Sequence, residues 1–403
     1  MTQPKPHSRW VAFLRRLLFP PFLFNFPLVE NLSGTRDLLA PIPCSHNKAK
    51  VEQIHCGRDS LWAKATELQS RMMDSSALIF IVCLVLSLQC CRLQDLQCPP
   101  VAPPSNITEF SCSSLSLSHF PAGFPERTTL ISVEFTNISS IGEDALLGLP
   151  KLQELHLSNN RLEDLPGGLF RDLPELHTLD LTSNLLEDLP PSIFESSSSL
   201  NHLFLKMNQL TKLRPQWFHP LRRLETLDLS NNQLKDVPPS CFSKLENLTA
   251  LDLSSNFLHQ LSPQILEGMP LLERLDLGGN HLHSIADKTF QEVPRLGFLF
   301  LQNNNLTRLP PGIFEPLRNL DTLFISENQI ASWDPGFSGQ LTNLSLDLAR
   351  NPWACDCLMS TFVDWVKRHS AILYSREEVV CASPESLKGR VVMSLKEAEF
   401  GVC

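Results

Sequence analysis

The chain has a single tyrosine, Tyr374, although it contains 24 phenylalanines and 31 prolines in 403 residues. Such a preference for one aromatic type favours a repeated template in which phenylalanine fills the same position many times. Long apolar runs are also missing, because the most apolar segment, residues 77–88, has only 12 residues. A membrane-spanning helix needs about 20 apolar residues, so we expect no membrane insertion.

Motifs that carry catalytic chemistry are absent from the sequence. There is no nucleophile elbow, HExxH, P-loop or GxGxxG followed by a helix, so we expect no enzymatic activity, catalytic residue or cofactor. The histidines are scattered, except that His259 and His283 occupy the same position in successive repeats, with His281 nearby. Solvated turn residues and a metal or pH-sensing pair are the two interpretations, and the first is favoured; we expect no metal site.

Cysteines are almost missing from the middle of the chain, where Cys241 stands alone and is expected to be a buried free thiol. The others crowd towards the two ends, which is typical of disulfide-bonded ends in a secreted protein. Residues 72–91 begin with Met72 and contain the short apolar run, so they are predicted to be a signal peptide. Residues 1–71 have no steady periodicity and are predicted to be a non-structural leader.

Positive charge is scarce beyond the signal segment. Residues 92–403 carry 24 Lys and Arg against 37 Asp and Glu. An acidic chain repels phosphate backbones, which makes nucleic acid an unsuitable partner. No apolar stretch follows the repeats, so we expect a soluble protein of the extracellular space without a membrane or lipid anchor.

Leucines recur every 24 residues from Leu152 to Leu320, and each opens the pattern LxxLxLxxNxLxxL. The pattern is that of the leucine-rich repeat, in which each short LxL segment is a strand with alternate side chains pointing inward. The predicted fold class is α/β, a curved right-handed leucine-rich-repeat solenoid with a parallel sheet on its concave face. We assign residues 130–350 to the repeats.

Two further columns of the repeat have structural roles. An asparagine amide at the turn after each strand is expected to bond the backbone of neighbouring turns. A phenylalanine column is expected to fill the convex edge, with Leu266 replacing it once. The asparagines are Asn160, Asn184, Asn208, Asn232, Asn256, Asn280, Asn304, Asn328 and Asn351, and the phenylalanines are Phe170, Phe194, Phe218, Phe242, Phe290 and Phe314.

Both ends of the array depart from the template, and the last turn is one residue short at Leu341, Leu344, Leu346 and Leu348. Because the ends of a solenoid expose its core, they need caps. We predict disulfide-bonded caps, an N-terminal one over residues 92–129 with Cys98 and Cys112, and a C-terminal one over residues 351–403. The C-terminal cap contains Cys355, Cys357, Cys381 and Cys403, for which disulfides are favoured over a metal half-site.

The residue between the two strand leucines faces outward on the concave side and is the candidate protein-binding surface. An acidic run at this position would favour a cationic partner, although aspartate is also common repeat filler. Exposed phenylalanines mark interaction sites, unless they pack beneath the cap or a glycan. The candidate residues at this position are Phe204, Asp228, Asp252, Asp276, Phe300 and Phe324. Phe298 is added because it is expected to point out of the sheet together with Phe300 and Phe324.

Glycosylation sequons fall in the segment expected to be secreted. The predicted N-glycan sites are Asn106, Asn137, Asn247, Asn305 and Asn343.

A resemblance to a known family rests on the opening turn at residues 133–139, the segment 151–157, the sequence Asn351-Pro352-Trp353 and the tail at 381–389. The chain resembles the leucine-rich alpha-2-glycoprotein family over roughly residues 98–392. The resemblance implies a secreted modulator of growth-factor signalling, linked to TGF-beta receptor complexes and vessel growth, with extracellular receptor or growth-factor proteins as partners. For the C-terminal cap it implies the pairs Cys355–Cys381 and Cys357–Cys403. The mammalian relatives have a reduced cap, whereas this chain has the four-cysteine form.

Two alternatives remain. Matrix proteins of the small leucine-rich proteoglycan type have a dense N-terminal cysteine cluster and a different C-terminal cap, neither of which is present here. A receptor ectodomain separated from its membrane segment is the other alternative, and the sequence leaves the oligomeric state open.

Overall fold

The computed structural model describes Cys98 and residues 105–334, 336–337, 341, 344–396 and 399. All the described residues belong to the unit Val85–Cys403. The leader and signal-peptide predictions for residues 1–91 lie outside the described residues, as do Cys403 and Asn343.

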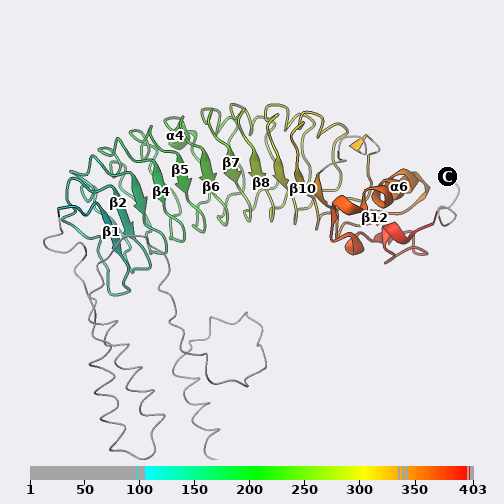
Figure 1. Cartoon of the computed structure of the whole chain (residues 1–403), viewed down its shortest axis with the longest axis horizontal. Coiled ribbons are helices and arrows are strands. Elements are labelled where there is room, and N and C mark those ends of the chain that lie inside the picture. The colour runs from blue at the N-terminus through cyan, green and yellow to red at the C-terminus, as the bar shows by residue number, and fades with distance from the viewer. Residues whose placement is uncertain are drawn as a thin grey trace, which may run out of the picture. The chain divides into compact units, whose positions relative to one another are not determined.

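A parallel sheet of twelve short strands runs through the described part of the chain, in the order β1 to β11 and then β13. Figure 1 shows these strands side by side along the inner side of an arc, as the predicted leucine-rich-repeat solenoid requires. The strands are β1 Glu109–Cys112, β2 Leu130–Val133, β3 Glu154–His156, β4 Thr178–Asp180, β5 His202–Phe204, β6 Thr226–Asp228, β7 Ala250–Asp252, β8 Arg274–Asp276, β9 Phe298–Phe300, β10 Thr322–Phe324, β11 Ser345–Asp347 and β13 Leu373–Tyr374.

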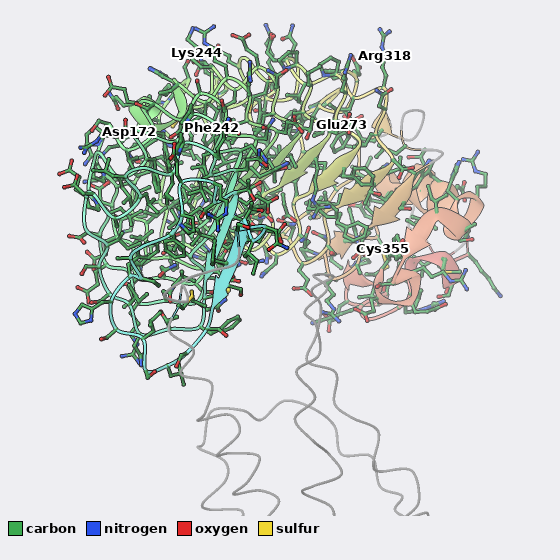
Figure 2. The ribbon with its side chains drawn as sticks, turned by 60° about the vertical axis from the view of Figure 1, so that its left-hand side comes forward. Asp172, Phe242, Lys244, Glu273, Arg318 and Cys355 are labelled. Atoms are coloured by element: carbon green, nitrogen blue, oxygen red, sulfur yellow. A yellow bond between two sulfur atoms is a disulfide. The ribbon has the colours of Figure 1, made fainter. Side chains whose placement is uncertain are left out.

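The core lies behind the sheet, because the central residue of every three-residue strand points inward. Leu155, Leu203 and Leu251 are fully or almost fully buried, and burying each such leucine stabilises the fold by about 2 kcal/mol. The predicted phenylalanine column is buried along the outer side of the arc, as is Leu266. Phe242 lies within the body in Figure 2, whereas Lys244 and Arg318 project from its outer side.

The predicted asparagine column is confirmed as a buried hydrogen-bond ladder. Asn232 donates from Nδ2 to the carbonyl oxygens of Leu205 and Leu229, both at 3.0 Å. Its Oδ1 accepts from the N–H of Leu210 at 3.0 Å. One amide thus satisfies backbone groups of two successive turns, which a buried loop requires.

The C-terminal end is closed by a compact cap built on indole and phenyl rings. Trp353 is fully buried and lies 4.7 Å from Phe362 and 6.2 Å from Trp333 between ring centroids. Apart from the sheet above and the short helix α4 (Pro215–Phe218), the remaining elements belong to this cap. They are β12 Trp353–Ala354, η1 Cys357–Met359, α6 Ser360–Arg368, η2 Ser370–Ile372, η3 Arg376–Glu378, β14 Cys381–Ser383 and η4 Val392–Ser394.

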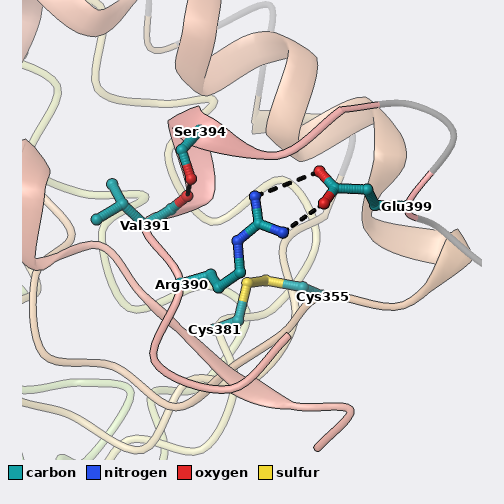
Figure 3. The surroundings of a disulfide bond; sticks show 6 residues. All are labelled: Cys355, Cys381, Arg390, Val391, Ser394 and Glu399. Atoms are coloured by element: carbon teal, nitrogen blue, oxygen red, sulfur yellow. Dashed lines mark hydrogen bonds and ion pairs between the residues drawn. A yellow bond between two sulfur atoms is a disulfide. The ribbon is translucent and has the colours of Figure 1, made fainter. Parts of the chain in front are cut away.

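Each end of the solenoid contains a disulfide, as expected. Cys98 is bonded to Cys112 in β1, and Cys355 is bonded to Cys381, which starts β14. Figure 3 shows the second bond beside the ion pair between Arg390 and Glu399. Cys357 is also disulfide-bonded, but its predicted partner Cys403 lies outside the described residues, so that pair stays a prediction.

Candidate functional site: the concave face

Each strand presents two outward positions on the concave face, one before and one after its buried central residue. We call them the first and second columns. Because the strands are parallel and in register, residues of one column lie directly beside each other from turn to turn. The second column contains His156, Asp180, Phe204, Asp228, Asp252, Asp276, Phe300, Phe324, Asp347 and Tyr374.

Asp228, Asp252 and Asp276 occupy three successive strands of the second column and are called the acidic stretch below. Each Oδ1 accepts the backbone N–H two residues later, from Ser230, Ser254 and Gly278. Asp180 and Asp347, elsewhere in the column, make the same bond at 2.9 and 3.1 Å. The bond explains why aspartate recurs as repeat filler, and the second carboxylate oxygen still carries negative charge towards the concave face.

Asp276 differs from the other two members because it is only 8% exposed. Burial, and then the negative charge of Asp252, raise the pKa of its carboxyl from 3.8 to about 6. Arg274 opposes this shift and places Nη2 3.3 Å from Oδ2 of Asp276. The raised pKa of Asp276 thus reflects its burial first and the neighbouring carboxylate second.

Aromatic rings continue the second column towards the cap. The ring centroids of Phe300 and Phe324 are 5.4 Å apart, and those of Phe324 and Tyr374 are 5.3 Å apart, both pairs edge to face. The Arg274 guanidinium lies 4.3 Å from the Phe300 ring centroid. We call Phe300, Phe324 and Tyr374 the aromatic ladder; Arg274 links it to the acidic stretch.

The remaining candidates lie apart from this group. Phe298 is 40% exposed but belongs to the first column, with Arg274 and Thr322 as its register neighbours. Phe204, on β5, is the register neighbour of Asp228 on β6. Its ring centroid lies 6.5 Å from that of His202. Phe300 and Phe324 thus come together as expected, whereas Phe298 and Phe204 do not join them.

Sequence reasoning missed Arg274 and Tyr374. Arg274 sits in the first column, and only its side-chain path brings it over Phe300. Tyr374 belongs to the cap, where no repeat pattern predicts that β13 continues the sheet beside β11. The one available signal was that Tyr374 is the sole tyrosine of the chain.

An open pocket of about 490 Å³ adjoins the ladder. It lies against the beginnings of β10, β11 and β13, and Tyr374 is one of its walls. Its lining is Asp321, Leu344, Ser345, Ala371, Ile372, Leu373 and Tyr374.

The histidines noted in the sequence form a stack of rings. His259 lies 5.5 Å from His281 and 6.1 Å from His283 between ring centroids. Among the residues that the structure describes, no group of three or more His, Cys, Asp or Glu is arranged to hold a metal ion. Within those residues no helix is both long and apolar enough to cross a bilayer.

The predicted glycan sites differ in accessibility. Asn106, Asn247 and Asn305 are exposed, whereas Asn137 is half-buried and donates from Nδ2 to the Leu115 carbonyl. Glycosylation at these positions stays a prediction, and Asn343 lies outside the described residues.

The stacked 24-residue turns, the asparagine ladder and the disulfide-bonded ends define a leucine-rich-repeat solenoid. The leucine rich repeat family matches the chain over residues 126–186, 174–234, 222–282, 272–330 and 294–352. A chain from the octameric complex of Latrophilin 3, Unc5D and FLRT2 (LRR) superposes with a TM-score of 0.59 at 26% identity, covering 73% of this chain and 97% of that one.

Two curated relatives match over 332 residues, which is 82% of this chain and the whole of each relative. They are phospholipase A2 inhibitor of Gloydius brevicaudus siniticus, 61% identical, and phospholipase A2 inhibitor beta of Elaphe climacophora, 67% identical. The chain belongs to the leucine-rich repeat family, in the branch that contains these inhibitors. The expected resemblance was thus right for the repeat family, while these relatives are phospholipase A2 inhibitors and not leucine-rich alpha-2-glycoprotein.

Proposed function

We propose that this protein is an extracellular inhibitor of a phospholipase A2, acting by binding the enzyme. The observation that carries the proposal is the 67% identity to phospholipase A2 inhibitor beta over that relative's whole length. The match extends over 332 residues, which is 82% of this chain.

The concave face is the proposed contact surface. The acidic stretch supplies a negative potential that attracts a cationic surface and speeds association. The adjoining aromatic ladder supplies the kind of rigid apolar contact that dominates binding energy in protein interfaces. Together they favour a partner whose surface combines positive charge with exposed apolar side chains.

Inhibition is tested by titrating the purified chain into secreted phospholipases A2 of basic and acidic net charge while phospholipid hydrolysis is followed. We expect a basic enzyme to be bound and inhibited and an acidic one to be much less affected. Absence of inhibition of every enzyme tested would reject the proposal.

The contact surface is tested with the double substitution Phe300→Ser and Phe324→Ser. We expect the affinity for the inhibited enzyme to fall at least tenfold, which is about 1.4 kcal/mol, in surface plasmon resonance. Phe257→Ser is the matched control, because Phe257 is 45% exposed but directly follows Asn256 of the asparagine column and does not lie in a strand. Equal affinities of wild type and the double variant would remove the concave face from the proposal.

Modulation of TGF-beta-type receptor signalling and of vessel growth stays a finer prediction that rests on the family resemblance alone. It is checked by adding the purified chain to endothelial cells and measuring receptor-driven phosphorylation. The matrix-structural and receptor-ectodomain alternatives predict instead that the protein is retained in the matrix or in detergent-extracted membranes.

A further inference from the structure

The pocket beside the aromatic ladder arises where the solenoid departs from its own period. In the preceding turns two successive N–H groups bond to one carbonyl of the turn before, as Asp321 and Thr322 do to Gly297. At β11 only Ser345 makes the corresponding bond, to the Asp321 carbonyl at 2.7 Å. The register step from Thr322 to Ser345 is 23 residues instead of 24, so one outward-facing residue is missing beside Asp321.

The neighbours of Asp321 on the adjacent turns are a glycine and a buried leucine. Gly297 precedes it in the same position of the repeat and has no side chain, while Leu344 on the following turn is buried. The missing residue and the glycine leave the Asp321 carboxylate at the edge of an unfilled space. The cap provides the far side of that space through Ala371, Ile372 and Tyr374.

The lining of the pocket has a distinct chemistry. Leu344, Ile372 and Leu373 are its aliphatic lining residues, and Asp321 is the one carboxylate among the seven lining residues, which include no cation. The Tyr374 ring, 52% exposed, stands at one wall. Aliphatic side chains, a tyrosine and a single carboxylate around one open space together match a side chain with an aliphatic stem and a cationic head.

A carboxylate and an aromatic ring also meet on the concave face at β8 and β9, within the chain itself. Arg274 lies 4.3 Å from the centroid of Phe300 and 3.3 Å from Oδ2 of Asp276. In the pocket the ring and the carboxylate are present, but the arginine is not supplied by the lining residues. The guanidinium group satisfies both, because it stacks on a ring while its edge donates to a carboxylate.

We propose that this pocket is an anchor site for an arginine side chain of the bound protein, with Asp321 and Tyr374 as its specificity-determining residues. The proposal rests on the proposed function in taking the occupant from a protein bound on the concave face. It extends the contact surface from the repeats onto the cap.

The pocket is tested first without any enzyme, using N-acetyl-arginine amide and N-acetyl-norleucine amide as probes in saturation-transfer NMR. We expect millimolar binding of the arginine probe only, lost in Ala371→Trp and weakened at least threefold in Asp321→Asn. Ala371 is exposed, so the indole fills the pocket without entering the core, and thermal melting verifies the fold of each variant. No arginine binding, or equal binding of norleucine amide, overturns the proposal.

The second arm measures the affinity of the phospholipase A2 that the chain inhibits. We expect Asp321→Asn and Ala371→Trp each to lower the affinity about tenfold. Glu273→Gln is the matched control and should leave the affinity unchanged. Glu273 (labelled in Figure 2) is exposed at the equivalent position directly before β8, and it is not one of the residues that line the pocket. Unchanged affinity in both pocket variants overturns the anchor site but leaves the inhibitor function standing. Arginine-amide binding without any enzyme binding rejects the function and retains the site.

Discussion

The acidic stretch and the aromatic ladder occupy the same column of the same sheet, yet they present opposite surfaces to a partner. Beneath both, the backbone, the buried leucines and the asparagine bonds are almost identical from turn to turn. The first difference lies in the outward residue, which changes from Asp276 on β8 to Phe300 on β9. A repeated scaffold thus fixes where a side chain points and leaves its chemistry free.

The two regions also differ in what surrounds them. The acidic stretch lies among regular turns, where each carboxylate accepts a backbone N–H of its own turn and Arg274 is the cation beside Asp276. The aromatic ladder crosses from the last regular turns into the cap, where the repeat shortens and Tyr374 enters from another part of the chain. The irregular end therefore has the more varied surface.

The largest expected effect comes from breaking the scaffold that both regions share. Asn256→Leu removes three donated bonds and one accepted bond in a residue that is 3% exposed. It leaves backbone groups of two turns unsatisfied, so we expect the free energy of unfolding to fall by about 3 kcal/mol or more. Urea denaturation measures the loss, with the exposed Asn319→Leu as the control. A loss in the free energy of unfolding below about 1 kcal/mol would show that the hydrogen bonds of the asparagine column are dispensable.

The next prediction separates the two regions by their roles in binding. Asp228→Asn with Asp252→Asn keeps the acceptors for Ser230 and Ser254 but removes two charges. We expect the association rate with a basic phospholipase A2 to fall about tenfold at low salt, and its salt dependence to weaken. Phe324→Ser should instead act on the dissociation rate. Surface plasmon resonance at several salt concentrations checks both, and Asp287→Asn, an exposed site outside the strands, is the control. Identical changes of the association and dissociation rates in the two variants would contradict separate roles for the acidic stretch and the aromatic ladder.

The smallest effect concerns the junction between the regions. Because the pKa of Asp276 is raised to about 6 in the folded chain, the folded state holds this proton more tightly than the unfolded state between about pH 4 and 6. Stability from this group is therefore present at low pH and is lost as the pH rises through that window. Asp276→Asn should stabilise the chain at pH 7.4 by about 1 to 2 kcal/mol. This gain is smaller than the free energy that corresponds to the pKa shift, because the substitution also removes the ion pair with Arg274.

Thermal melting across the pH range measures this effect. The gain should shrink towards zero near pH 4, while the exposed Asp164→Asn serves as control. A stabilisation that does not vary with pH would mean that ionisation of Asp276 is not its cause.

Much of the fold was predictable because it repeats. The leucine period, the asparagine column and the phenylalanine column each recur often enough to fix strand, turn and core positions without three-dimensional information, and the structure confirms them. The adjacency of Asp228, Asp252 and Asp276 followed from the same period. Phe298 was grouped with Phe300 and Phe324 because all three were expected to point out of the sheet. The structure places Phe298 outward as well, but in the first column instead of the second.

By itself the sequence determined the solenoid, its register and the side chains that line each column, because parallel strands at a fixed spacing convert sequence position directly into place. Only the tertiary structure decided that Tyr374 completes the aromatic ladder, that Arg274 bridges the two regions, and that the short turn opens a pocket beside Asp321. These features depend on contacts between the repeats and a cap that does not share their period. Where the period ends, sequence spacing no longer fixes distance, and packing determines which residues meet.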